Sequence, residues 1–131
     1  MTPADPVTVF LRDRGLADEI VSEGAEGFVA RWEQAARDAE RDRYPFGIED
    51  WLNELDGRQL LHDLSAQVQG SLPGGLAARL GEADARVQAA TVAAGACLWG
   101  DALAARMGWR AAHEWWYWRT PRAVVEDFEG A

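Results

Sequence analysis

Apolar residues recur every three or four positions along most of this 131-residue chain. This spacing places them on one face of an α-helix, whereas a half-buried strand requires alternation with a period of two. The longest example begins at Leu76 and continues through Leu80 and Val87 as far as Ala94. We therefore expect a mainly α-helical chain, because helices turn such spacing into a continuous buried stripe.

Capping residues and glycines divide the first part of the pattern. Asp5 and Pro6 are a favourable helix start, since Asp caps free backbone N–H groups and proline suits the first helical turn. They predict a helix over residues 5–14. A second helical region is expected from Leu16 to about Arg41, with a break near Gly24 because glycine weakens a helix.

The middle of the chain contains further turn and cap signals. A short helix is expected from Ile48 to Leu55, and Asp56-Gly57 should interrupt it. Asp56 and Gln59 have capping-box spacing, which predicts a new helix that continues to Gly70. The loop Ser71-Leu72-Pro73-Gly74-Gly75 follows, and a short alanine-rich helix is expected around residues 101–107.

The run Trp115-Trp116-Tyr117-Trp118 differs from the rest of the chain. Aromatic residues favour strands, so the run should either pair with Ala96–Trp99 as a small hairpin or cross the bundle as an extended segment. Alternate side chains of an extended segment face opposite sides. Either Trp115 and Tyr117 or Trp116 and Trp118 should then be exposed.

These elements predict a mainly α, compact bundle of five or six helices with a short aromatic extended or β-hairpin-like C-terminal segment. The length suits a single domain over residues 1–131, and seven tryptophans in a 48% hydrophobic chain provide enough apolar surface for a core. Residues 123–131 are expected to form an acidic, mobile tail whose removal has little effect.

Charge and cysteine content exclude several classes of function. The net charge of −9 repels phosphate, so general nucleic-acid binding is disfavoured. No segment is apolar and long enough to span a bilayer, and the N-terminus lacks the features of a secretory signal, so a cytoplasmic location is expected. A single cysteine forms neither an internal disulfide nor a cysteine-based zinc site.

The charge changes sign near the C-terminus. Residues 1–105 contain 9 Arg and 18 carboxylates, a balance of −9, whereas residues 106–122 contain 4 Arg and one Glu, a balance of +3. Five of the seven tryptophans lie at or after position 99. Tryptophan and arginine are typical interface anchors, and arginine stacks on indole rings. The candidate binding residues are therefore Trp109, Arg110, Trp116, Trp118, Arg119 and Arg122. The alternative is that the tryptophans plug one end of the bundle while Arg119 or Arg122 pairs with acids elsewhere.

Candidate chemical groups are few. His113-Glu114 resembles the start of a zinc-protease motif, but Tyr117 stands where the second histidine is needed. His62 lies far from His113 in sequence, and Cys97 sits in an alanine-rich segment where a thiol usually packs as a small apolar group. Glu19, Glu23 and Glu26 share a helix face. This spacing suits metal ligands, but it is also typical of a solvated helix surface. We predict no catalytic group, metal or cofactor.

Three functions remain after these exclusions. The first is a non-enzymatic acidic protein-binding module, such as an inhibitor, immunity protein or antitoxin, acting on a basic protein target. The second is a small-molecule-binding protein or small metal-dependent hydrolase that uses the aromatic C-terminal region as a pocket. The third, single-stranded nucleic-acid binding through stacked Trp and Arg, is opposed by the overall charge. The sequence leaves homo-oligomerisation open.

Overall fold

The computed structural model describes residues 5–123 and confirms the mainly α-helical prediction. Within these residues, five α-helices pack together with one 3-10 helix and a two-stranded antiparallel sheet near the C-terminus. None of the described helices is long and apolar enough to cross a membrane. The elements in chain order are α1 (Pro6–Asp13), α2 (Asp18–Ala39), α3 (Ile48–Gln67), α4 (Gly74–Ala90), β1 (Thr91–Ala93), α5 (Asp101–Met107), η1 (Trp115–Trp118) and β2 (Arg119–Pro121).

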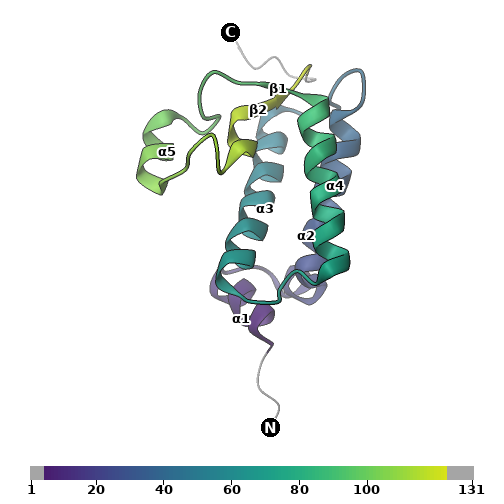
Figure 1. Cartoon of the computed structure of the whole chain (residues 1–131), viewed down its shortest axis with the longest axis vertical. Coiled ribbons are helices and arrows are strands. Elements are labelled where there is room, and N and C mark those ends of the chain that lie inside the picture. Colours follow the sequence, from purple (N-terminus) through teal and green to yellow (C-terminus); the bar gives the residue numbers. More distant parts are fainter. Residues whose placement is uncertain (1–4, 124–131) are drawn as a thin grey trace.

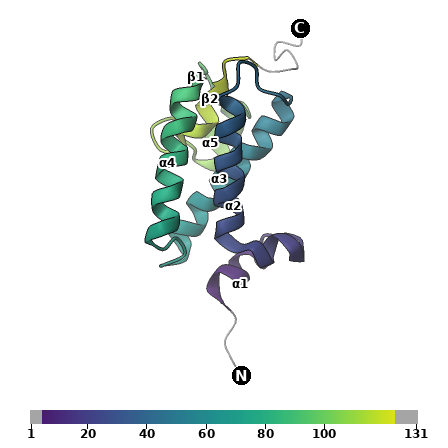
Figure 2. The same ribbon diagram turned by 90° about the vertical axis from the view of Figure 1, so that its right-hand side faces the viewer.

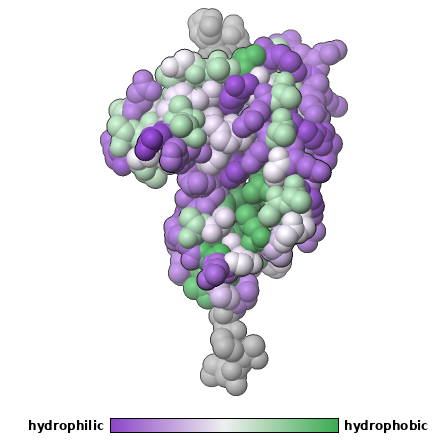
Figure 3. Space-filling view, in the orientation of Figure 1, coloured by the Kyte–Doolittle hydropathy of each residue, from purple (hydrophilic) through white to green (hydrophobic). Residues whose placement is uncertain are grey.

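Helix α2 is the centre of the molecule. It packs along both α3 and α4, whereas α3 and α4 have little direct contact with each other. The three helices follow the long axis, α1 crosses one end, and α5 projects to the side (Figures 1 and 2). Figure 3 shows apolar side chains between the ridges of α3 and α4 on a face that is otherwise largely hydrophilic.

The N-terminal helices follow the sequence pattern. Asp5 caps α1 by accepting a hydrogen bond from the Thr8 N–H at 3.1 Å, and α1 ends before Gly15, as predicted. The expected break in α2 is at Gly24, whose φ of 64° and ψ of −157° interrupt the helical path. Phe28 and Trp32 follow this kink and are buried against the neighbouring helices.

Helix α3 corrects one prediction. Residues 48–67 form a single helix that passes through Asp56 and Gly57, so the predicted interruption and the new capping box are wrong. Trp51, Leu55 and Leu61 are buried on one continuous stripe. Burial of this stripe outweighs the local weakness of Gly57, which is at most about 1 kcal/mol relative to alanine.

Helix α4 is also shorter than its sequence pattern suggests. It ends at Ala90, and the chain then extends into β1 instead of continuing to Ala94. The expected antiparallel pairing near the C-terminus is present, but it joins β1 to β2, with Val92 opposite Thr120. The aromatic run and residues 96–99 do not form paired strands, although the Leu98 N–H donates to the Tyr117 carbonyl at 2.8 Å. Beyond β2, the Ala123 carbonyl accepts a hydrogen bond from the Tyr44 N–H, and the rest of the predicted acidic tail lies outside the described residues.

A polar connection joins the three long helices in their core. Asp84 on α4 accepts hydrogen bonds from Arg58 Nε and Nη2 on α3 at 2.8 and 2.9 Å. It also accepts one from the Trp32 indole N–H on α2 at 2.8 Å. Arg58 is only 8% exposed, so this carboxylate compensates a buried charge and fixes the spacing of α3 and α4 where they do not pack directly.

Candidate functional site

The aromatic run forms a 3-10 helix, not the extended segment predicted from its composition. A 3-10 helix has three residues per turn, so positions three apart share a face. Trp116 and Tyr117 are buried, and Trp115 and Trp118 are half-buried. The predicted alternation of exposed residues is therefore wrong: the two middle residues are buried, and the two end residues, Trp115 and Trp118, are partly exposed and pack against the core.

The inward-facing residues attach η1 to α3. The Trp116 indole N–H donates to Gln59 Oε1 at 3.2 Å, and the Arg58 guanidinium carbon lies 4.3 Å from the centre of the Trp116 ring. The Tyr117 hydroxyl donates to Asp56 at 2.8 Å, and burial is the main reason that its pKa is raised above the usual value. These contacts with α3 make η1 a firmly attached base for its partly exposed residues, Trp115 and Trp118.

Arg119 fastens the end of η1 to α4 and β1. Its Nε donates to Thr91 Oγ1 at 3.0 Å, and its Nη2 donates to the backbone carbonyls of Gln88 and Thr91 at 2.9 and 2.6 Å. Its own carbonyl accepts a hydrogen bond from the buried Trp51 indole at 3.0 Å. The guanidinium thus donates hydrogen bonds to carbonyls at the end of α4 that have no partner within the helix. The helix dipole also stabilises a positive charge at this end.

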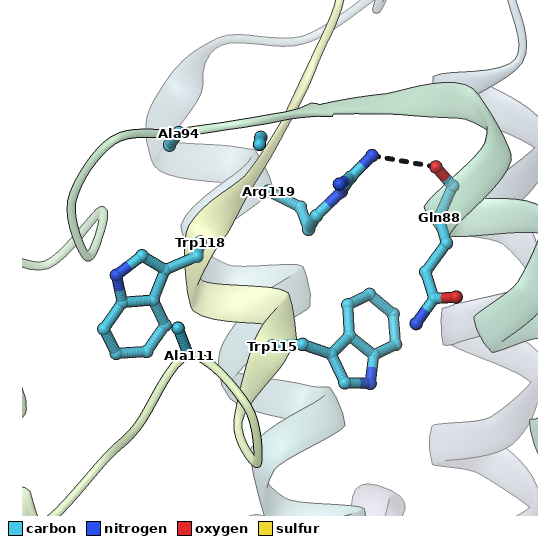
Figure 4. A pocket seen from close by; sticks show the side chains of 7 residues that line it. Gln88, Ala94, Ala111, Trp115, Trp118 and Arg119 are labelled. Carbon is cyan, nitrogen blue, oxygen red and sulfur yellow. Dashed lines mark hydrogen bonds between the residues drawn. The ribbon is translucent and has the colours of Figure 1, made fainter.

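A pocket of about 350 Å³ lies over this base and is here called the indole pocket. Figure 4 shows Trp115 and Trp118 on either side of Ala111, with Arg119 and Gln88 along the edge nearer α4. Within the described residues, neither the Trp115 nor the Trp118 indole N–H donates a hydrogen bond, unlike those of Trp32, Trp51, Trp99 and Trp116. The complete lining is Gln88, Ala93, Ala94, Ala111, Trp115, Trp118 and Arg119.

The structure separates the six predicted binding residues. Trp118 and Arg119 line the indole pocket, but Trp116 is buried beneath it. Trp109 stacks on Tyr117 with ring centres 4.1 Å apart. Arg110 is exposed and uses its backbone N–H to bond Glu114, and Arg122 is exposed beside Glu40 and Arg86.

Sequence reasoning missed Trp115 and Gln88 as pocket residues. The three-residue interval between Trp115 and Trp118 is the signal that indicates a shared face, once the run is assigned to a 3-10 helix. Gln88 gives no such signal, because it occupies an exposed position near the end of α4. It lines the pocket because the pairing of β1 with β2 brings η1 beside that end of α4.

The remaining candidate chemical groups lie apart from the indole pocket. Within residues 5–123, no group of three or more His, Cys, Asp or Glu side chains is placed to hold a metal ion. Cys97 is buried, and burial raises the pKa of its thiol, which disfavours the reactive thiolate. His62 Nε2 lies 3.8 Å from the buried Glu114 carboxylate, beyond hydrogen-bond distance.

Glu23 and Glu26, which the sequence placed on one helix face, form ion pairs with Arg31 and Arg79 at 3.0 and 3.4 Å. The indole pocket is therefore the place where residues predicted from the sequence, Trp118 and Arg119, lie beside uncommitted indole N–H groups. The chain matches no protein-family model, no curated protein and no solved structure.

Proposed function

We propose that this protein is a non-enzymatic binding module whose protein partner docks over the indole pocket. The observation that carries the proposal is the pair Trp115 and Trp118, half-buried on a firmly attached turn with both indole N–H groups uncommitted. Tryptophan on a rigid base is a typical interface anchor, because it offers a large apolar surface and a hydrogen-bond donor with little loss of side-chain entropy.

Three large apolar side chains of the C-terminal region are exposed, although none of them lines the indole pocket. Val92, Trp99 and Met107 are 43%, 40% and 56% exposed, and they are three of the five large apolar side chains exposed in the described part of the chain. They belong to the segment that also contains β1, α5 and η1. Their exposure argues against a segment that serves only as an internal plug, because a plug would bury its large apolar side chains.

The partner is expected to be a basic protein. The net charge of −9 attracts a positively charged surface over several ångströms and accelerates encounter, an effect that salt screens. Arg119 keeps its positive charge, because its partners Thr91 and the backbone carbonyls are neutral, so the attraction comes from the acidic remainder of the chain. Inhibitors, immunity proteins and antitoxins are the classes that combine these properties.

The test is affinity capture from the native host with the tagged protein and two single variants. Trp118→Ala removes an indole-pocket wall, and Trp99→Ala removes an indole of similar exposure that lies outside the pocket. We expect one stoichiometric partner that the wild type and Trp99→Ala retain and Trp118→Ala loses. Circular dichroism must show that both variants keep the helical fold.

Equal capture by all three proteins would contradict docking over the indole pocket. A partner with a net negative charge, or binding that is insensitive to salt, would contradict the electrostatic part of the proposal. No partner for any of the three would reject the binding-module function.

A further inference from the structure

Neither the backbone conformation nor close packing requires a glycine at position 57. It lies inside α3 without the positive φ that favours glycine, and a Cβ there would meet only Phe28 Cδ1, at an ordinary distance of 3.9 Å. Glycine weakens a helix relative to alanine. The missing side chain instead opens space between α2 and α3.

That space is a pocket of about 340 Å³, here called the Gly57 pocket. Ile20, Phe28 and Trp32 of α2 form its apolar wall, and Asn53, Glu54 and Arg58 of α3 form its polar wall. Ile20 and Phe28 lie on opposite sides of the Gly24 kink, so the kink shapes the α2 wall. The volume is at the lower end of the range for small-molecule sites.

Arg58 supplies the polar group that indicates a ligand. Its Nε and Nη2 are bonded to Asp84, and one face of its guanidinium is covered by Trp116. Its Nη1 is the one buried side-chain nitrogen or oxygen of the described residues that has no hydrogen-bond partner. Nη1 points away from Asp84 in this paired geometry, and an acceptor on its side would complete the bonding of a residue that is only 8% exposed.

We propose that the Gly57 pocket binds a small molecule with a flat apolar body and a carboxylate. The body would pack over Gly57 against Phe28 and Trp32, and the carboxylate would accept hydrogen bonds from Arg58 Nη1 and the Asn53 amide. Because water does not reach Nη1, small side-chain shifts at the pocket wall must accompany binding. The site is separate from the indole pocket and does not depend on the proposed partner.

The unpartnered donor Arg58 Nη1, and not the net charge, favours an acid over an amine in this pocket. Two guanidinium groups, those of Arg31 and Arg58, line it, and each is already paired with a carboxylate outside the lining, Glu23 and Asp84. Glu54 is the remaining ionisable group, and its ionised form would repel an acid, but burial raises its pKa and so favours the neutral form. A bound carboxylate would favour the protonated form of Glu54 further, so binding should take up a proton and strengthen in mildly acid solution.

The experiment is an NMR titration of the full chain with phenylacetate, with phenethylamine as the matched cation. Phenylacetate should shift the Trp32 indole N–H signal and the backbone amides of residues 53–58 saturably, and phenethylamine should leave them unchanged. Gly57→Leu fills the pocket, and Gly81→Leu adds the same side chain to an open helical position on α4.

Gly57→Leu should weaken phenylacetate binding at least about tenfold, the usual penalty for blocking a small pocket. Gly57→Ala, which fits without a clash, should weaken it less and keeps the test valid if the leucine variant does not fold. Gly81→Leu should bind like the wild type.

Four results would overturn the proposal. The first is the absence of a saturable shift with phenylacetate, and the second is binding of phenethylamine with the same affinity. The third is wild-type affinity for phenylacetate in folded Gly57→Leu and Gly57→Ala. The fourth is a set of shifts centred on the Trp115 indole instead of the Trp32 indole.

Discussion

Glu54 illustrates how one partly buried carboxyl group affects stability. Burial beside α2 raises its pKa above the usual glutamate value, and nearby Asp38 and Asp50 act in the same direction, against Arg31. Its charged form is therefore disfavoured in the folded state. Its favourable contribution is complete below the ordinary glutamate pKa and is lost as the pH rises through the raised folded-state value.

We expect Glu54→Gln to stabilise the protein at neutral pH by about 1 kcal/mol or less, because the neutral amide avoids the cost of the partly buried charge. The gain should shrink as the pH falls toward the ordinary glutamate pKa, where the wild-type side chain is also neutral. Urea unfolding at a series of pH values measures this difference. Glu82→Gln, on the exposed surface of α4, is the control, and the same pH dependence in both variants would contradict the argument.

At the scale of elements, two ion pairs between helices should differ sharply in importance. The Arg58–Asp84 pair is largely buried, with side-chain exposures of 9% and 21%, whereas Arg86 and Glu40 are 43% and 40% exposed. Removing one partner of a buried pair leaves an uncompensated charge, but an exposed pair is replaced by water.

Asp84→Ala should therefore destabilise the protein by about 3 kcal/mol, at the low end for a broken buried pair because Asp84 is partly exposed. The same change leaves the Trp32 indole N–H without its acceptor. Arg86→Ala should have an unfolding midpoint close to that of the wild type. Chemical denaturation of both variants checks the contrast, and similar midpoints would show that Asp84 does not hold the three helices together.

The same scale shows what the sequence could predict. The periodic stripes of α1, α2 and α4 and the break at Gly24 were predictable, because apolar spacing and glycine act locally. The continuity of α3 through Gly57 was not, since it depends on the burial of Trp51 and Leu61 by other elements. The indole pocket was predicted in part, because Trp118 and Arg119 were candidate binding residues and both line it. The composition of the aromatic run suggested a strand. Its attachment to α3 and α4, which the sequence does not reveal, selects a 3-10 helix instead.

At the scale of the whole molecule, η1 and β2 close an arrangement that the long helices leave open. α3 and α4 both pack on α2 without packing closely on each other, and η1 packs against α3 beside this gap. Trp115 reaches α2, with its ring centre 6.5 Å from that of Trp32. The C-terminal elements thus cover core residues that come from earlier in the chain.

We expect a chain that ends after Gly108 to lose fixed tertiary packing while it keeps much of its helix content. Its near-ultraviolet circular dichroism should be weak, and it should bind a dye for exposed apolar surface, as molten globules do. A chain that ends after Ala123 keeps the described contacts and should unfold in one cooperative transition. Cooperative unfolding of the shorter chain would contradict the closing role of η1 and β2.

The late position of η1 also matters while the protein is being made. A ribosome adds residues in order, so α2, α3 and α4 are complete before the tryptophans that cover the gap between them have been added. During that interval the nascent chain exposes apolar surface, the condition under which chaperones bind and aggregation begins. The rate of translation after residue 108 should therefore influence the yield of folded protein.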